Sequence, residues 1–163
     1  MLPSFIKEYK MIKVGIIGGA GYTAGELLRV LLHHPEVELS SVMSTSHAGE
    51  AISKAHPELE GDTELVFKQH MNADVDIVFL CTGHGKSKQV LDEVKLPTSI
   101  KIIDLSADFR LKAESHDYVY GLPELQKEQI KRANNIANPG CFATCIQLSL
   151  LPLAFAGHLT NDI

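Results

Sequence analysis

The sequence lacks the features that would place it with nucleic-acid-binding, membrane or secreted proteins. Its formal net charge is −5. It has no run of roughly five basic residues, so nucleic acid is not expected as a main partner. No uninterrupted apolar stretch reaches the roughly 18 residues that a membrane-spanning helix needs. The opening segment, MLPSFIKEYK, has no apolar core and no small-residue cleavage site, and we expect residues 1–11 to be a loose leader.

Cysteine is also scarce, with only Cys81, Cys141 and Cys145 in the chain. An odd and sparse set does not suit a disulfide framework and indicates a reducing compartment, so we expect a cytoplasmic protein. The 163 residues, 45% of them hydrophobic and 21% charged, suit one soluble globular domain with a real core.

Short apolar, β-branched runs alternate with segments of helical periodicity along the chain. The runs predict strands at 13–19, 37–43, 63–67, 75–81, 100–106 and 135–138, the third of them weak. The periodic segments predict helices at 22–34, 86–94, 123–134 and 141–157. This alternation indicates an α/β fold, a Rossmann-like doubly wound and mostly parallel sheet with helices on both faces. The polar stretch 44–62 is expected to form a long surface loop.

A glycine-rich turn with the pattern G-x-x-G-x-x-A joins the first predicted strand to the first predicted helix. Glycines in such a turn let the backbone approach a pyrophosphate closely, and the N-terminus of the following helix offers free N–H groups. The alternative is a tight turn with a structural role alone. We predict that a dinucleotide binds here to Gly18, Gly19, Gly21, Tyr22, Thr23 and Ala24.

The end of the second predicted strand carries no carboxylate, which an NAD site usually places there to bind the ribose 2′-hydroxyl. The residues are Ser44, Thr45 and Ser46 instead. Small hydroxyl groups can accept a 2′-phosphate, so we predict NADP as the cofactor, bound in part by Ser44 and Thr45. The alternative is that these side chains only cap the following loop, and no arginine stands here to bind the phosphate.

A second glycine cluster, Gly83-His84-Gly85, follows the fourth predicted strand. Loops at the carboxyl ends of strands line the ligand crevice of a doubly wound sheet. We therefore place Gly83 and His84 with the cofactor-binding residues. A histidine in a solvated loop is the alternative for His84.

The Asn-Pro-Gly segment at 138–140 turns the chain into the last predicted helix and puts Cys141 at its start. A helix N-terminus stabilises the thiolate, the nucleophilic form of cysteine. A nucleophile beside a nicotinamide indicates capture of an acyl group as a thioester, followed by hydride transfer. A small buried cysteine is the alternative. Cys81 and Cys145 are expected to be inert core residues, and no further ligands complete a metal site with Cys145.

Two charged residues allow either a functional or a structural interpretation. Arg110, in the segment DLSADFR, either binds a substrate anion in bidentate fashion or pairs with Asp104 or Asp108 and holds the loop. We place Arg110 as the candidate substrate-binding residue. Glu124 suits either the first turn of a helix, where the dipole favours a carboxylate, or the wall of a site.

Four segments together resemble the N-acetyl-γ-glutamyl-phosphate reductases of arginine biosynthesis. They are GIIGGAGYTAGELLRVL (15–31), IIDLSADFRL (102–111), YGLPEL (120–125) and IANPGCFAT (136–144). The resemblance implies NADPH-dependent reduction of an acyl phosphate to a semialdehyde, with Cys141 as the nucleophile that forms the thioester. A related semialdehyde dehydrogenase and a non-catalytic nucleotide-binding module are the alternatives.

The chain departs from this family in three respects. The family often has arginine where Thr45 stands, and usually glycine or alanine where Cys145 stands. Its members also run to about twice this length, with a second domain that carries a catalytic histidine and most of the dimer interface. The resemblance therefore implies an NADP-binding domain at 12–157, the start of an absent domain at 158–163, a small-molecule acyl-phosphate substrate, and a homo-oligomer in the full-length form.

Overall fold

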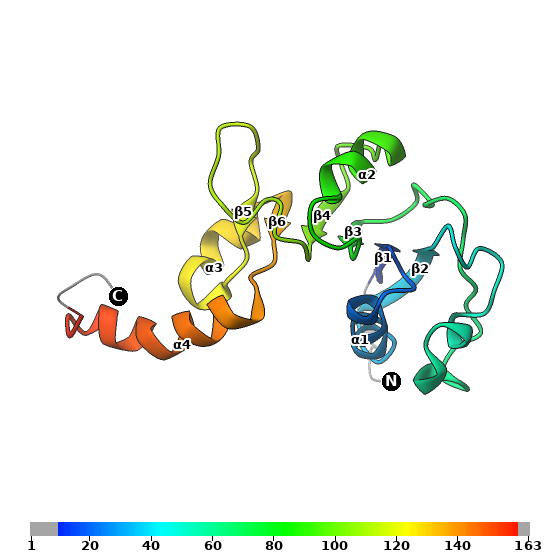
Figure 1. Ribbon diagram of the computed structural model, residues 1–163, viewed down its shortest axis with the longest axis horizontal. Coiled ribbons are helices and arrows are strands. Elements are labelled where there is room, and N and C mark those ends of the chain that lie inside the picture. The colour runs from blue at the N-terminus through cyan, green and yellow to red at the C-terminus, as the bar shows by residue number, and fades with distance from the viewer. Residues whose placement is uncertain (1–9, 160–163) are drawn as a thin grey trace, which may run out of the picture. The chain divides into compact units, whose positions relative to one another are not determined.

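The computed structural model describes residues 10–159, and the chain divides into two compact units. The first unit extends to Val78 and the second begins at Phe79. Figure 1 labels the helices and strands of each unit.

Six strands form a sheet among the residues that the structure describes. They are β1 (Ile12–Ile17), β2 (Val37–Met43), β3 (Ile77–Leu80), β4 (Lys101–Asp104), β5 (Val119–Tyr120) and β6 (Asn135–Ala137). Their hydrogen-bonded order is β2-β1-β3-β4-β6-β5, and the boundary between the units falls within β3. The pairs β1–β2, β4–β6 and β5–β6 are parallel. The predicted α/β, Rossmann-like fold is confirmed.

In the first unit, the helix α1 (Tyr22–Leu31) connects the parallel strands β1 and β2. The apolar residues of α1 recur at helical spacing, so one face of the helix is buried. This face consists of Ala24, Gly25, Leu28 and Leu31. The core of the unit also contains strand residues that are almost completely buried, namely Val14, Ile16, Ile17, Val42 and Val78.

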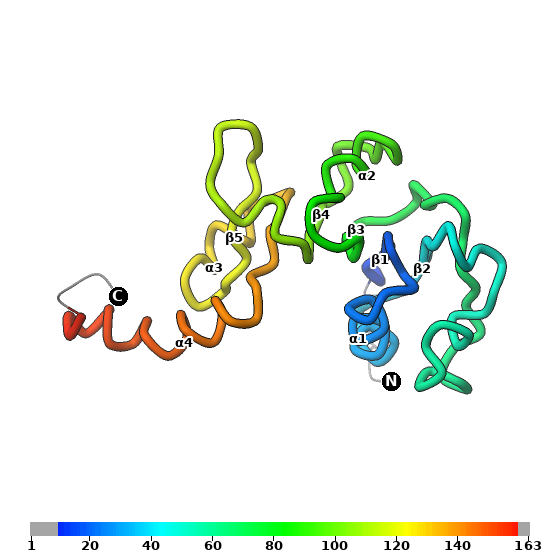
Figure 2. The backbone as a smooth tube through the Cα atoms, viewed as in Figure 1, coloured from blue at the N-terminus to red at the C-terminus, as the bar shows by residue number. Residues whose placement is uncertain are grey.

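The 44–68 segment, between β2 and β3, differs from the polar surface loop and the weak strand that the sequence indicated. It contains two short 3₁₀ helices, η1 (Ile52–Lys54) and η2 (Pro57–Leu59). The predicted strand at 63–67 is wrong, because this stretch takes part only in one isolated bridge, between Val66 and Ala51. Figure 2 shows how the backbone of the segment folds back on itself. Backbone hydrogen bonds of Gly49 and Ile52 with Phe67 and Leu65 close it, and Ile52 and Phe67 are at most 1% exposed.

The second unit contains the later strands and three helices, α2 (Ser87–Val94), α3 (Pro123–Arg132) and α4 (Cys141–Phe155). These helices lie where the sequence predicted them, with ends that differ by at most two residues. The strand β5 was not predicted, because two residues are too short to show an alternating pattern. The interior of this unit combines apolar residues with buried polar ones, and it includes Leu80, Ser87, Ile100, Asp104, Ser106, Leu122 and Ala137.

The helix α4 is mostly apolar, yet none of its residues is buried among the described part of the chain. Phe142 and Phe155 are 83% and 72% exposed. A hydrogen bond from the Tyr120 hydroxyl to Oε1 of Gln147, at 3.0 Å, connects the helix to β5. Over residues 10–159, no helix combines the length and apolar character that a membrane crossing demands.

Candidate functional site

Two glycines of the turn after β1, Gly18 and Gly19, occupy backbone positions that disfavour a side chain. Gly18 has a φ of 82°, in the left-handed region that favours glycine. The N–H groups of Gly18 and Gly19 donate to the carbonyl oxygen of Met43, at 3.1 and 2.8 Å, so the turn is held against the end of β2. A Cβ at Gly19 would lie 2.4 Å from Cγ1 of Val42. Gly18 and Gly19 are therefore required for the shape of the turn itself.

The free amides of this turn lie at the start of α1. Gly21 is the N-cap residue, and no side chain caps the helix. The N–H of Gly25 donates to the carbonyl oxygen of Gly21 at 3.1 Å, so the N–H groups of Tyr22, Thr23 and Ala24 precede the first intrahelical donor. Such amides, together with the positive end of the helix dipole, suit an anion. The backbone N–H groups of Tyr22, Thr23 and Ala24 can therefore bind a phosphate, whereas those of Gly18 and Gly19 are donated to Met43, and the binding of a cofactor at the turn stays a prediction.

The hydroxyl groups after β2 differ in their exposure. Ser44 is 6% exposed, and its N–H donates to the carbonyl oxygen of Lys68 at 3.1 Å. Its hydroxyl oxygen lies 3.3 Å from that of Ser46, while Thr45 and Ser46 are exposed. Ser44 therefore shapes the loop, and the hydroxyls that a ligand can reach most easily belong to Thr45 and Ser46. Contact of Ser44 or Thr45 with a cofactor stays a prediction.

One residue beside the glycine turn, His56, was not identified as a candidate from the sequence. His56 is 4% exposed, and its Nε2 lies 2.7 Å from the carbonyl oxygen of Gly19. Its Nδ1 would lie 2.6 Å from a Cβ placed on Gly25 and lies 3.8 Å from Oε1 of Glu58. The sequence indicates the burial of His56 only weakly. A proline directly follows the histidine, and its few apolar neighbours show no regular period.

Gly25→Ala is expected to destabilise the chain, although alanine is the better helix former by about 1 kcal/mol. The new Cβ would fall 2.6 Å from Nδ1 of His56, a buried ring with little room to move. We expect the free energy of unfolding in urea to fall by about 1–3 kcal/mol, as for other overpacked cores. Val30→Ala, at a 55% exposed position of the same helix, is the matched control and should change little. A Gly25→Ala chain more stable than the parent would contradict the packing of His56.

In the second unit, the loop after β3 is bound to the loop after β4. Gly83 and Gly85 have φ angles of 80° and 78°, which favour glycine. The N–H of Ala107 donates to Nδ1 of His84 at 3.0 Å. Because Nδ1 accepts this bond, the proton of a neutral ring is on Nε2. His84 is exposed but is held by the neighbouring loop, and a role beside the cofactor stays a prediction.

Asp108 fixes the start of α2. The N–H groups of Gly85 and Ser87 donate to its two carboxylate oxygens, at 2.6 and 2.9 Å. Partial burial acts to raise the pKa of Asp108, but the hydrogen bonds from Gly85, Ser87 and Ser106 outweigh it, and the pKa lies below its ordinary value.

Asp108→Asn is expected to lower the free energy of unfolding by about 1 kcal/mol near neutral pH, as for loss of other helix-capping carboxylates. Because the folded pKa is depressed, the contribution of the carboxylate is present above the unfolded pKa of about 3.9 and is lost as the pH falls through the folded value. Urea titrations of both chains near neutral pH and at about pH 3 measure this. Asp92→Asn, an exposed position of α2, should have little effect. A loss that is independent of pH would refute the electrostatic explanation.

Asp104 is fully buried beneath these loops. Its carboxylate oxygens accept hydrogen bonds from the hydroxyls of Ser87 and Ser106, at 2.7 and 2.6 Å. Burial, together with the charge of Asp104, raises the pKa of Cys81 to about 12. The Cys81 thiol therefore stays protonated near neutral pH, in agreement with the expectation that it is inert.

Cys141 is the first residue of α4 and is exposed. The N-cap residue is Gly140, in extended conformation, and no side chain caps the helix. The first amides of α4 are therefore not occupied by a capping side chain. This arrangement is the one that the Asn-Pro-Gly-Cys pattern predicted, and it does not suit the alternative of a buried structural cysteine.

Arg110 supports the turn that precedes Cys141. Its Nε donates to the carbonyl oxygen of Asn138 at 2.8 Å, and its Nη2 donates to that of Leu105 at 3.0 Å. A Cβ on Gly140 would lie 2.8 Å from Nη1, so a side chain at this position would displace the guanidinium. Arg110 thus holds the loop, as one of the two interpretations expected, but through backbone carbonyls. Substrate binding by Arg110 stays a prediction.

Two further residues can be compared with their expected places. Cys145 was expected in the core, and this is wrong, because it is exposed on a helix that buries none of its residues within 10–159. Glu124 is exposed in the first turn of α3, which suits the interpretation as a carboxylate favoured by the helix dipole.

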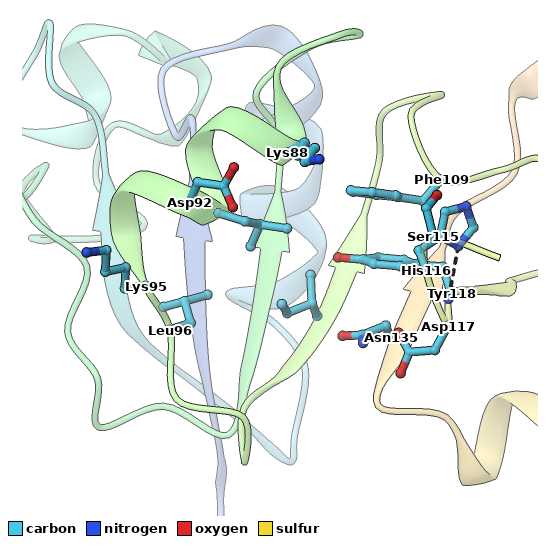
Figure 3. A pocket seen from close by; sticks show the side chains of 12 residues that line it. Lys88, Asp92, Lys95, Leu96, Phe109, Ser115, His116, Asp117, Tyr118 and Asn135 are labelled. Carbon is cyan, nitrogen blue, oxygen red and sulfur yellow. Dashed lines mark hydrogen bonds between the residues drawn. The ribbon is translucent and has the colours of Figure 1, made fainter. Parts of the chain in front are cut away.

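A cavity of about 400 Å³ lies within the second unit, between α2 and the segment that leads to β5. Figure 3 shows residues of α2 on one side and the stacked rings of Phe109 and Tyr118, 4.1 Å apart, on the other. The Tyr118 hydroxyl is buried with no hydrogen-bond partner in the described chain. Burial and the charges of Asp104 and Asp117 raise the pKa of Tyr118. None of the residues predicted for the site lines this cavity. Between residues 10 and 159, no cluster of His, Cys, Asp or Glu has the arrangement of a metal site.

The comparisons with known proteins agree with the motifs. The family model described as "Semialdehyde dehydrogenase, NAD binding domain" matches residues 13–133. The chain is 58% identical over 153 residues to the N-acetyl-gamma-glutamyl-phosphate reductase of Christiangramia forsetii. It is 55% identical over 157 residues to that of Flavobacterium johnsoniae. Each alignment covers 94% of this chain and 48% of the relative, so the chain spans about half the length of these curated relatives. The resemblance to this group of reductases is confirmed.

Solved structures with a similar fold are semialdehyde dehydrogenases as well. The aspartate semialdehyde dehydrogenase of Candida albicans, with NADP, has a TM-score of 0.65 at 19% identity, over 92% of this chain and 48% of that one. The aspartate semialdehyde dehydrogenase II of Vibrio cholerae, complexed with ASA, has a TM-score of 0.65 at 19% identity, over 90% of this chain and 47% of that one. At this level of identity the likeness shows the fold.

Proposed function

The chain belongs to the semialdehyde dehydrogenase family through its NAD-binding domain, and we propose that it is the cofactor-binding half of an NADPH-dependent acyl-phosphate reductase. The proposed reaction converts N-acetyl-γ-glutamyl phosphate to N-acetylglutamate semialdehyde, as the names of the closely similar reductases suggest. The observation that carries the proposal is the exposed Cys141 at the start of α4. A domain that only binds a nucleotide has no use for such a thiol.

The glycine turn supports the cofactor part of the proposal. The pyrophosphate of the dinucleotide would bind the N–H groups of Tyr22, Thr23 and Ala24, since these amides precede the first intrahelical donor and no side chain caps the helix. Ser44 and Thr45 are proposed to contact the 2′-phosphate, and Gly83 and His84 to border the cofactor. When bound, NADPH supplies the hydride for the reduction.

Cys141 supplies the nucleophile. Its thiolate attacks the acyl carbon, the bond from that carbon to the phosphate oxygen breaks, and phosphate leaves with the bonding electrons. The acyl group is then held as a thioester on Cys141. After reduction, the tetrahedral carbon expels the thiolate and the semialdehyde is released. The N-terminus of α4 stabilises the thiolate, and Arg110 keeps the preceding turn in place through the carbonyls of Asn138 and Leu105.

The remaining parts of the enzyme are proposals by analogy with the longer relatives. We assign residues 12–157 to the NADP-binding domain and 158–163 to the start of a second domain. That second domain would supply the acid–base group and most of the contacts of a cytoplasmic homo-oligomer.

NADP(H) is expected to bind this chain at least several-fold tighter than NAD(H). The end of β2 offers hydroxyl groups and no carboxylate, so a 2′-phosphate meets no like charge there. Calorimetric titration of the 163-residue chain with each nucleotide measures the ratio.

A substituted chain tests where the preference arises. Ser46→Asp introduces a carboxylate at the exposed end of the loop and should weaken NADP(H) more than NAD(H). Ser99→Asp adds the same charge in the exposed loop before β4 and is the matched control. Equal affinities for the two nucleotides in the parent chain would refute the assignment of Ser44 and Thr45.

A further inference from the structure

His56 is a buried polar side chain that the proposed reaction does not use. It is 4% exposed, and its ring centroid lies 6.2 Å from that of Phe67. Its backbone N–H donates to the carbonyl oxygen of Ile52 at 3.0 Å, which ties it to η1. Contacts with other residues of the 44–68 segment therefore fix the position of the ring.

The ring bonds to the glycine turn through one nitrogen. Nε2 lies 2.7 Å from the carbonyl oxygen of Gly19. A carbonyl oxygen only accepts hydrogen bonds, so Nε2 carries the proton and donates. In a planar trans peptide the C=O and the following N–H point in opposite directions. A Gly19 carbonyl fixed on His56 therefore directs the N–H of Ala20 away from the ring.

The other nitrogen of the ring faces α1. Nδ1 and Cε1 would lie 2.6 and 2.9 Å from a Cβ at Gly25, so the ring is packed against the backbone of the helix. His56 thus contacts both structures that present free amides, which are the glycine turn and the first turns of α1. Within residues 10–159, no backbone N–H donates to the carbonyl oxygen of Gly19, so the ring of His56 is its donor.

We propose that His56 is a positioning residue for the pyrophosphate of the dinucleotide. By holding the Gly19 carbonyl toward the interior, it orients the N–H of Ala20 so that this amide and those at the start of α1 serve one anion. This inference rests on the proposed function, since it requires that the turn bind a dinucleotide. His56 itself acts through the backbone.

The affinity of the 163-residue chain for NADPH tests the proposal. His56→Phe keeps a ring but removes the donor, and the dissociation constant measured by calorimetry should rise about 10-fold. His56→Gln retains an amide N–H and should recover most of the affinity. His70→Phe, at an exposed histidine, is the matched control and should bind NADPH as the parent does.

A second ligand separates positioning from a general structural role. Adenosine 2′-monophosphate carries the 2′-phosphate but no pyrophosphate, and its dissociation constant, measured by NMR titration, should be unchanged in His56→Phe. An equal loss for both ligands, or no loss for NADPH, would overturn the proposal. If His56→Phe does not fold, as checked by urea titration, His56→Asn takes its place, since the shorter side chain does not reach Gly19. A parent chain that binds adenosine 2′-monophosphate but not NADPH would overturn the proposed function as well.

Discussion

The 163-residue chain is expected to reduce N-acetyl-γ-glutamyl phosphate at least about a thousandfold more slowly than the full-length relative from Christiangramia forsetii. The chain spans 48% of that relative. A positioned acid–base group is worth roughly 10²–10⁴ in rate, and orientation of the substrate adds to this. We assign both contributions to the part of the longer relatives that this chain does not match.

Oxidation of NADPH, followed for both proteins at equal concentration, measures the difference. Near-normal turnover by the 163-residue chain would contradict the assignment and would place the acid–base group within it. His84 would then be the first residue to substitute. Its Nδ1 accepts the N–H of Ala107, so Nε2 is the ring nitrogen left to exchange a proton with substrate.

Cys141→Ser is expected to slow acylation of the chain by at least about 10³-fold, as for loss of the nucleophile in other covalent mechanisms. A serine hydroxyl at the same position is not ionised near neutral pH and lacks the nucleophilic strength of a thiolate. The rate is measured by quenching mixtures of chain and acyl phosphate at intervals and recording the intact mass.

Cys145→Ser is the matched control for this change. Cys145 lies one turn further along α4 and is also exposed, so both substitutions remove an accessible thiol from the same helix. The control should acylate at the rate of the parent chain. If Cys145→Ser is the slower variant, the nucleophile has been assigned to the wrong cysteine.

The local geometry that the sequence predicted correctly is encoded within a few consecutive residues. The glycine turn follows from the left-handed φ of Gly18 and the close packing of Gly19, which only glycine permits, so the motif and the geometry have the same cause. The place of Cys141 follows in the same way, because Pro139 and Gly140 turn the chain directly before the helix.

The parts that the sequence did not predict depend on residues far apart in the chain. His56 and Gly19 are 37 residues apart, and no local pattern indicates that they meet. Arg110 was placed as the candidate substrate-binding residue, with pairing to Asp104 or Asp108 as the alternative, and its donors bind the backbone carbonyls of Asn138 and Leu105. Every residue type has such a carbonyl, so no pattern of side chains in the sequence indicates these two contacts. Cys145 was placed in the core because α4 is apolar, and an apolar sequence does not say which surface covers it.

In the proposed reaction, one chain carries both the nucleophile and the binding site for the hydride donor. The most direct measurement loads the chain with N-acetyl-γ-glutamyl phosphate, locates the acyl group by peptide mass mapping, and then follows its loss with and without NADPH. We expect one acyl group on Cys141, lost faster when NADPH is present, with release of the semialdehyde. An acyl group on another residue, or a lifetime on Cys141 that NADPH does not shorten, would contradict the account.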